Sequence, residues 1–261
     1  MSTNILEKIV ATKVSEVAER KQQISVAQLE AMPLFGEKTY SLKNNLLDAS
    51  KTGIIAEFKR QSPSKGIINA VADVVEVTKA YTQFGASGVS VLTDGPYFGG
   101  SLNDLSIAVK NEIPVLRKEF IIDEFQVIEA KAFGASVILL IASCLKPAET
   151  KLLAAKAKQL GMEVLLELHD ETELDYICEE VDLVGINNRS LKSFEVNIEH
   201  SLKLKDLLPK GKLSIAESGI YDLATFKLLK QEGFDGFLMG EYFMKQENPA
   251  KAFEEFSKQI K

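Results

Sequence analysis

The stretch YTQFGASGVSVL at residues 81–92 joins a helix-like segment to a short apolar run through Gly85, and this pattern indicates the fold. It returns with variation as AKAFGASVILLI at 130–141, AKQLGMEVLLEL at 157–168 and KQEGFDGFLM at 230–239. A helix that ends at a left-handed glycine and is followed by a buried strand produces this pattern. The predicted helix ends are Gly85, Gly134, Gly161 and Gly233.

Short apolar runs recur along the whole chain and predict its strands. They lie near residues 53–58, 88–92, 113–118, 136–141, 163–168, 182–187, 213–217 and 235–239, and the segments between them are long enough for helices. Apolar strands buried on both faces are typical of a parallel sheet, and eight strand–helix units in one domain favour closure of that sheet. The prediction is therefore an α/β fold, a (βα)8 TIM barrel, with a doubly wound open sheet as the alternative.

Residues 1–50 precede the first predicted strand and have a helical pattern of their own. Ile5, Ile9, Val10, Val14 and Val17 recur at helical spacing, Pro33 interrupts the chain, and SLKNNLLDA at 41–49 indicates a second short helix. The segment is too short to fold alone. We expect one domain over residues 1–261, with residues 1–50 as a helical N-terminal extension packed across one end of the barrel.

Composition narrows the class of partner. A formal charge of −6 argues against nucleic acid or an anionic membrane as the main partner. Cys144 and Cys178 lie outside any C-x-x-C spacing, which predicts neither a disulfide framework nor a metal site. The first twenty residues carry a charge every few positions and resemble neither a signal peptide nor a membrane span. We expect a cytoplasmic protein, a monomer or weak homo-oligomer, that binds a small anionic molecule.

Charged residues interrupt the first predicted strand, IIAEFKRQSP at 54–63. Side chains alternate along a strand, so Ile55, Glu57 and Lys59 share one face. Polar residues also occur at the carboxyl ends of other predicted strands. In a barrel these ends converge at one mouth, where the active sites of barrel enzymes lie. These strand-end residues are Lys118 with Phe120, Glu167 with His169, Asn187 with Arg189, and Glu217 with Gly219.

A structural interpretation exists for each of these residues alone, because a strand-end carboxylate often caps a helix or pairs with a nearby lysine. Together they are harder to explain by stability. Burying three carboxylates and two lysines costs several kcal/mol per ion, to order of magnitude, unless all are paired. Proton-transfer sites do require such groups, because neighbouring charges shift pKa values.

Arginine usage indicates an anion site. Of the 31 lysines and arginines only four are arginines, and Arg60, Arg117 and Arg189 lie at or beside predicted strand ends. Arg189 is the candidate phosphate ligand, whereas Arg60 and Arg117 are out of phase with the inward positions and are expected to be structural. Glycine-bearing turns follow the last two strands, ESGI at 217–220 and MGEYFM at 239–244, where barrels of this class bind phosphate.

The full set of motifs resembles the indole-3-glycerol phosphate synthase family. The resemblance is carried in order by IIAEFKRQSPSKG (54–66), PVLRKEFI (114–121), LLELHD (165–170), GINNR (185–189), IAESGI (215–220) and FLMGE (237–241). The Glu-x-Lys-x-x-Ser-Pro-Ser element together with R-K-E-F is the specific part. SVLTDGPYFGGS (90–101) and the N-terminal extension are also similar to that family.

The resemblance implies conversion of 1-(2-carboxyphenylamino)-1-deoxy-D-ribulose 5-phosphate to indole-3-glycerol phosphate, CO2 and water, without a cofactor. Lys118 matches the family's general acid. The other implied catalytic residues are Glu167, Glu57, Lys59, Asn187 and Glu217. Which of the two lysines delivers the proton in the dehydration step stays open. The implied substrate- or phosphate-binding residues are Ser62 or Lys65, Phe120, Arg189, Ser218, Gly219, Leu238, Gly240 and Glu241.

Glu241 departs from those family members that have serine or threonine after the last glycine. A carboxylate aimed at a phosphate weakens its binding, so we expect the Glu241 side chain to face away and only its backbone to contribute. His169 is expected to support Glu167 rather than react.

Two other classes of function stay open. A Schiff-base aldolase also uses a lysine at a barrel strand end, although apolar surroundings suit it better than three carboxylates. A noncatalytic barrel that binds a phosphosugar would need the phosphate site but not the acid and base positions.

Overall fold

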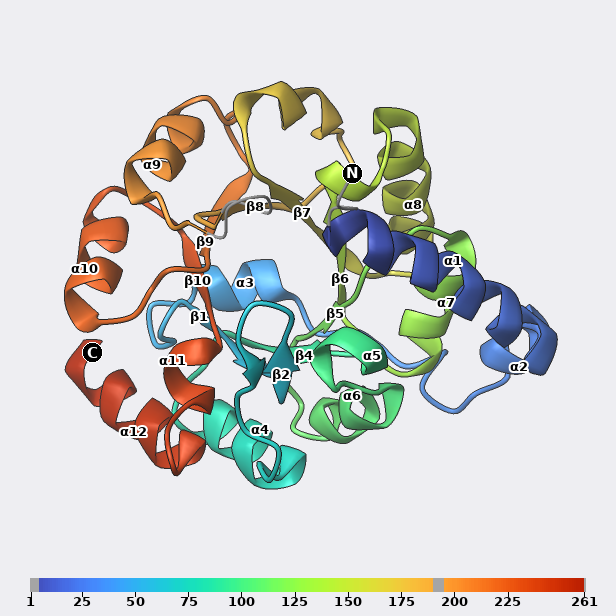
Figure 1. The fold of residues 1–261 in the computed structure, drawn as a ribbon, viewed down its shortest axis with the longest axis horizontal. Coiled ribbons are helices and arrows are strands. Elements are labelled where there is room, and N and C mark those ends of the chain that lie inside the picture. Colours follow the sequence, from blue (N-terminus) through green and yellow to red (C-terminus); the bar gives the residue numbers. More distant parts are fainter. Residues whose placement is uncertain (1–4, 190–194, 261) are drawn as a thin grey trace.

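The computed structural model describes residues 5–189 and 195–260, and they form a closed barrel of eight parallel strands inside a ring of helices (Figure 1). The strands follow the order β1-β10-β9-β8-β7-β6-β5-β4 around the barrel. Closure excludes the doubly wound open sheet and confirms the predicted fold class. The barrel strands are β1 Ile54–Phe58, β4 Gly88–Leu92, β5 Val115–Lys118, β6 Val137–Ile141, β7 Glu163–Leu168, β8 Leu183–Asn187, β9 Leu213–Glu217 and β10 Gly236–Met239.

The four recurrences of the sequence pattern form the same C-terminal helix cap. The residue after each glycine donates its backbone N–H to the carbonyl five positions earlier, as in Ala86 to Tyr81 at 3.0 Å. Gly85, Gly134, Gly161 and Gly233 have φ angles of 91°, 85°, 75° and 82°. A left-handed residue at this place lets the chain leave the helix and enter the next strand directly.

Helices cover the outer face of the barrel. Their apolar sides pack on outward strand residues, such as Ile54, Phe58 and Val89, in one continuous core. The helices after the first strand are α4 Val74–Gln83, α5 Gly95–Phe98, α6 Leu102–Val109, α7 Glu124–Ala132, α8 Pro147–Gln159, α9 Ile198–Asp206, α10 Leu223–Gln231, α11 Glu241–Met244 and α12 Pro249–Ile260.

Three local elements differ from the predicted alternation. A two-stranded hairpin, β2 Gln61–Ser62 and β3 Gly66–Ile67, follows β1, and 3₁₀ helices occupy Ala142–Cys144 and Glu171–Tyr176. The 3₁₀ helix Glu171–Tyr176 lies between β7 and β8, where the sequence pattern predicts an α-helix. Its Glu173 turns back to accept the backbone N–H of His169 at 2.6 Å, which holds the segment in a tight turn.

The N-terminal helices are α1 Ile5–Gln23, α2 Val26–Glu30 and α3 Leu42–Leu47, and they reach both ends of the barrel. Leu42 and Leu46 of α3 pack on the apolar residues inside the barrel and close the end where the strands begin. In Figure 1 α3 lies within the ring of helices, behind the strands. Val17 of α1 packs instead with Phe125 and Ile128 of α7.

Helix α1 faces the barrel differently from the predicted apolar pattern. Val14 is 56% exposed, and Lys13 beside it is 3% exposed. The Lys13 ammonium lies 2.8 Å from Asp94, 3.1 Å from Glu119 and 2.6 Å from Glu16. An ion-paired lysine therefore occupies the inward position and turns Val14 outward.

The barrel interior has an apolar lower layer and a polar upper layer. Below, Ile55, Leu116, Leu165 and Ile215 pack with α3. Two residues further along the same strands, Glu57, Lys118, Glu167 and Glu217 point to the same side at the carboxyl end. The alternation that fills a barrel core thus also assembles a charged cluster above it.

Candidate active site

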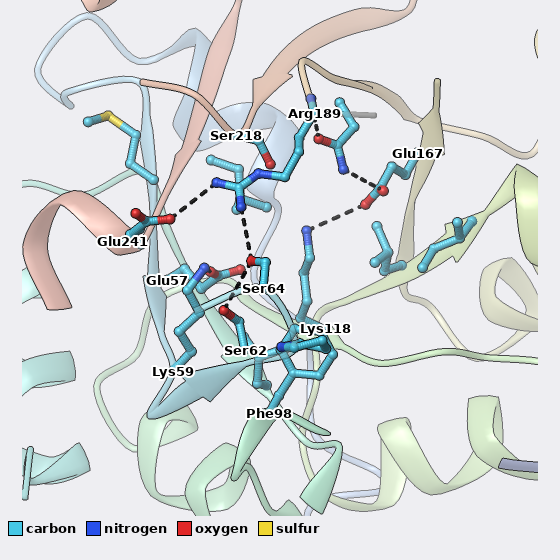
Figure 2. Close-up of a pocket in the computed structure, with 18 of the residues that line it drawn as sticks. Glu57, Lys59, Ser62, Ser64, Phe98, Lys118, Glu167, Arg189, Ser218 and Glu241 are labelled. Carbon is cyan, nitrogen blue, oxygen red and sulfur yellow. Dashed lines mark hydrogen bonds and ion pairs between the residues drawn. The ribbon is translucent and has the colours of Figure 1, made fainter. Parts of the chain in front are cut away.

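A pocket opens at the carboxyl ends of the strands and brings the predicted residues together (Figure 2). Glu217 lies beneath this lining, 1% exposed, and contacts it through Lys118. Lys65 and His169 contact residues of the lining, Glu241 and Glu167 respectively. The predicted residues that line the pocket are Glu57, Lys59, Ser62, Lys118, Phe120, Glu167, Asn187, Arg189, Ser218, Gly219, Leu238, Gly240 and Glu241.

Lys118 ends strand β5 between two carboxylates from other strands. Its Nζ donates to Glu217 Oε2 at 2.8 Å and lies 3.5 Å from Glu167 Oε2. Burial lowers the pKa of the Lys118 ammonium, but the charges of Glu217, Glu167 and Glu57 outweigh burial and raise that pKa above its usual value. Lys118 therefore holds a proton in the resting site.

The two carboxyl groups beside Lys118 differ in proton affinity. Burial and the charge of Glu167 raise the pKa of Glu217 to about 7, although Lys118 opposes them. Burial also raises the pKa of Glu167, but Lys118, His169 and Asn187 outweigh it and hold that pKa well below its usual value. At neutral pH the site contains an ionised Glu167 and a Glu217 that exchanges its proton.

Glu167 is held in place by two further side chains. The Asn187 amide donates to Glu167 Oε1 at 2.9 Å, and His169 Nε2 lies 3.2 Å from the same oxygen. Burial lowers the pKa of His169, but Glu167 and Glu173 outweigh it and raise the pKa to about 10. A positively charged His169 thus supports Glu167 from behind the lining.

Glu57 and Lys59 form a second pair, from β1. Lys59 Nζ lies 2.7 Å from Glu57 Oε1. Burial raises the pKa of Glu57, but the charges of Lys59 and Lys118 outweigh it, and the pKa is lower than usual. Gly240 leaves the space that this carboxylate needs, because a Cβ there would lie 2.5 Å from Glu57 Oε1. Glycine is thus required after β10 for close approach.

Gly185 leaves room for the carboxyl group of Glu217, as Gly240 does for that of Glu57. A Cβ at position 185 would lie 1.9 Å from Glu217 Oε1. That oxygen is buried and has no hydrogen-bond partner within the described residues. A buried carboxyl oxygen without a partner disfavours the ionised form, which agrees with the raised pKa of Glu217.

The structural assignment of two arginines is confirmed. Arg117 points outward from β5 and bonds Glu129 Oε2 at 2.7 Å and the carbonyl of Gln126 at 2.8 Å. Arg60 forms a forked pair with Asp104 at 2.7 and 3.0 Å.

The opposite side of the pocket has features of an anion site. Arg189 Nη2 donates to the Tyr221 hydroxyl at 2.7 Å, and Nη1 donates to Ser64 Oγ at 3.1 Å. Ser218 and Gly219 have φ angles of 64° and 72°, so two successive residues are left-handed. A Cβ at Gly219 would lie 2.4 Å from Val196, which restricts this turn to glycine. Left-handed conformation at the non-glycine Ser218 is a strained feature of the kind found at functional sites.

The expectation that Glu241 faces away is wrong. Its carboxylate lies 3.2 Å from Arg189 Nη2 and 3.7 Å from Lys65 Nζ, inside the anion side of the pocket (Figure 2). The attraction of two cations explains this orientation. Parity along β10 does not reach position 241, since the strand ends at Met239.

Several lining residues were missed by the sequence analysis. The apolar wall combines Phe120 with Phe98, whose ring centroids are 5.9 Å apart, and with Ile5, Leu6 and Ile9 of α1. Phe98 belongs to the family-like stretch at 90–101, and Tyr221 directly follows ESGI, so both carried a signal. No sequence signal indicated that residues of helix α1 line the pocket, because their apolar pattern equally predicts packing against a hydrophobic core.

The described residues show neither a metal-binding cluster nor a membrane-spanning helix. Within residues 5–189 and 195–260, no group of three or more His, Cys, Asp or Glu side chains is arranged to hold a metal ion. In the part of the chain that the structure describes, no helix is long and apolar enough to cross a membrane.

Comparison with known families and proteins places the sequence clearly. A family model described as indole-3-glycerol phosphate synthase matches residues 6–256. The sequence is 45% identical over 258 residues to indole-3-glycerol phosphate synthase of Bacteroides thetaiotaomicron, which covers 98% of this chain and 99% of that protein. It is 40% identical over 263 residues to the indole-3-glycerol phosphate synthase of Polynucleobacter necessarius, with 97% and 98% covered.

Solved structures with distant sequences share the barrel. Thiamine phosphate pyrophosphorylase from Pyrococcus furiosus matches with a TM-score of 0.57 and 14% identity over 84% of this chain and 99% of that one. Orotidine 5'-phosphate decarboxylase from Pyrococcus horikoshii matches with a TM-score of 0.56 and 13% identity over 71% and 92%. At such identities the likeness concerns the fold alone.

Proposed function

The chain belongs to the indole-3-glycerol phosphate synthase family, and on that premise we propose that the pocket at the carboxyl ends of the strands is its active site. The activity is that of a carboxy-lyase of tryptophan biosynthesis, acting on a small phosphorylated substrate. The roles of the individual residues are our proposal.

The substrate lies across the pocket from the anion side to the charged cluster. Its phosphate binds Arg189, the backbone of Gly219 and Gly240, and Ser62 or Lys65. Its carboxyphenyl ring lies against Phe120 and Leu238, with Phe98 beside them, since aromatic rings contribute large apolar contacts. Lys59 faces the substrate carboxylate. The two ends of the substrate are thereby held while the groups between them react.

Ring closure joins the aromatic carbon that carries the carboxylate to the C2 carbonyl carbon of the ribulose chain. As that bond forms, the carbonyl π electrons move to oxygen, and Lys118 donates a proton to it. A developing alkoxide is far more basic than an amine, so the transfer is favourable even from a lysine whose pKa is raised. Lys118 is thus the general acid, and Glu217 at 2.8 Å orients its ammonium.

Two eliminations complete the reaction. The bond from the ring carbon to the carboxylate breaks, CO2 leaves, and the electron pair restores aromaticity. The new hydroxyl then leaves as water with a proton from a lysine, and a proton on the adjacent carbon goes to a carboxylate to form the indole double bond. Glu167 and Glu57 act as the bases, because both have lowered pKa values and lie beside the lysines, at 3.5 Å from Lys118 and 2.7 Å from Lys59 respectively. One substrate gives one indole product, one CO2 and one water.

The single observation that carries these roles is the position of Lys118 between Glu217 and Glu167 at the base of a pocket with an arginine at its other side. A Schiff-base aldolase needs a neutral lysine, whereas the three carboxylates near Lys118 keep it protonated. A noncatalytic phosphosugar-binding barrel gives no reason to bury three carboxylates with two lysines.

Product analysis tests these roles directly. The wild-type protein is incubated with the carboxyphenylamino-deoxyribulose phosphate, and CO2 and the indole product are measured together, with and without borohydride. We expect equal amounts of both products and no covalent adduct after reduction. A reduced adduct on Lys118 or Lys59 would contradict general acid catalysis and support an imine mechanism.

We further propose a cytoplasmic location and a monomeric or weakly associating chain, consistent with the free thiols of Cys144 and Cys178. Sedimentation equilibrium and cell fractionation test both statements. A tight dimer at nanomolar concentration, or recovery outside the cytoplasmic fraction, would contradict them.

A further inference from the structure

The guanidinium of Arg189 is already paired with a carboxylate. Glu241 Oε2 lies 3.2 Å from Nη2, which also donates to Tyr221 at 2.7 Å, while Nη1 donates to Ser64 at 3.1 Å. Figure 2 shows Glu241 and Ser64 on either side of the guanidinium. The cation expected to bind phosphate is thus neutralised by the protein itself.

A second cation meets the same carboxylate. Lys65, on the hairpin after β1, places its Nζ 3.7 Å from Glu241 Oε1. The Glu241 and Arg189 side chains are 18% and 17% exposed, so the pair borders the pocket without being sealed in it. The Glu241 carboxylate therefore pairs with both cations at the place where a bound anion would contact them.

We propose that Glu241 is an internal counter-ion that occupies the cation side of the phosphate site and is displaced by the substrate phosphate. The proposal rests on the proposed function, because it assigns the phosphate to Arg189. A carboxylate and a phosphate dianion repel each other at contact distance, so the close pairing of Glu241 with the guanidinium opposes phosphate binding there. Binding then exchanges one ion pair for another, and Glu241 sets how tightly the phosphate is held.

The position of Glu241 makes the exchange feasible. It is the first residue of α11, next to Gly240, and its partly exposed side chain can turn toward solvent by rotation about its own bonds. Arg189 keeps its hydrogen bonds to Tyr221 and Ser64 during such a rotation, so its planar fork stays aimed at the pocket. Affinity for phosphate therefore depends on the charge of residue 241 rather than on rebuilding the site.

Inorganic phosphate titrated into the protein by calorimetry, at constant ionic strength and pH 8, measures this competition without any chemistry. Glu241→Gln keeps the size of the side chain and removes its charge, and Glu241→Ser is a second variant. We expect the Kd for phosphate to fall roughly tenfold in both, because the guanidinium is no longer neutralised. The matched control is Glu255→Gln, which breaks an exposed Lys251–Glu255 pair of 3.8 Å on α12 and changes net charge equally.

The substrate KM and the inhibition constant of inorganic phosphate are expected to fall together in the two Glu241 variants and to stay at wild-type values in the control. Phosphate affinity that is unchanged or weaker in Glu241→Gln would overturn the proposal, because Glu241 would then order Arg189 rather than compete for it. Wild-type turnover is scored separately. If the wild type shows no turnover while phosphate binds more tightly to the variants, the proposed catalytic roles are refuted and the counter-ion role of Glu241 is supported.

Discussion

Proton affinities in the pocket follow from how deeply each carboxyl group is buried and how many cations surround it. Glu57 and Glu167 each face a lysine, and their pKa values are lower than usual. Glu217 shares Lys118 with Glu167 and has one oxygen without a partner, and its pKa is raised to about 7. The site therefore contains one protonated lysine between an ionised carboxylate and one that titrates near neutrality.

Replacing Glu217 with glutamine changes how stability depends on pH. The folded pKa of Glu217, about 7, exceeds its ordinary value of 4.5. Its contribution to stability is therefore fully present below pH 4.5 and is lost as pH rises through about 7. Relative to wild type, we expect Glu217→Gln to gain on the order of 2 to 3 kcal/mol between pH 5 and pH 8.

Urea unfolding of both proteins at several pH values measures this difference. Glu57 and Glu167 titrate below the window, because their pKa values are lowered. Unfolding free energies that stay parallel for wild type and variant from pH 5 to pH 8 would show that Glu217 is not the titrating group.

Gly240→Ala is expected to reduce turnover about 10- to 100-fold. The new Cβ would lie 2.5 Å from Glu57 Oε1 and 2.8 Å from Glu57 Cβ, so the carboxylate must move, and small misplacements of reacting groups cost this much. Gly36→Ala is the control, since a Cβ there meets nothing within 4 Å. Steady-state kinetics of the two variants measure this loss. Wild-type turnover in Gly240→Ala would contradict the prediction, because the reaction would then tolerate displacement of Glu57.

At the scale of elements, helix α1 ties the N-terminal extension to the active strands. Burial lowers the pKa of Lys13, but Glu119, Asp94 and Glu16 outweigh it and raise that pKa. Glu119 directly follows Lys118, and Asp94 begins the turn into α5, which carries Phe98. One buried lysine thus links α1 to the strand of the proposed general acid and to the aromatic wall.

Lys13→Met keeps the length of the side chain, leaves the buried Asp94 without its cation and leaves the buried Glu119 with only the more distant Arg117, at 3.8 Å. Breaking a buried ion pair in this way costs about 3 to 5 kcal/mol, so we expect a loss of that size in the free energy of unfolding. Lys8→Met, on the exposed side of the same helix, is expected to change it by less than about 0.5 kcal/mol. Equal unfolding midpoints for the two variants would contradict the proposed link.

The elements that depend on local patterns could be predicted from the sequence, and those that depend on distant partners could not. The strands and the four glycine helix ends follow from apolar runs and from the left-handed conformation that glycine permits. Burial of Lys13 in place of Val14 required knowledge of Asp94 and Glu119, which lie 81 and more residues away. The 3₁₀ helix at Glu171–Tyr176 likewise depends on where Glu173 finds its partners.

For the whole molecule, barrel closure turns strand parity into a site. Parity placed Glu57, Lys118 and Glu167 on the inner side correctly, with Lys59 beside Glu57 at the end of the same strand. Closure then brought Lys118 of β5 within contact of Glu217 of β9, on the other side of the barrel. The expectation for Glu241 rested on repulsion from a bound phosphate, and it failed because the side chain instead pairs with the nearest cations, Arg189 and Lys65. The contribution of α1 to the pocket depends on how the N-terminal extension packs across the mouth.

Removal of the Lys118 side chain tests whether this residue is the general acid of the reaction. The measurement is the fluorescence of indole-3-glycerol phosphate formed from the carboxyphenylamino-deoxyribulose phosphate by wild type, Lys118→Ala and Lys158→Ala. Lys158 pairs with Asp182 at 2.7 Å away from the pocket and serves as the matched lysine control. We predict that Lys118→Ala loses about 10²- to 10⁴-fold in kcat while Lys158→Ala keeps wild-type turnover. Turnover by Lys118→Ala within tenfold of wild type would show that Lys118 is not the general acid.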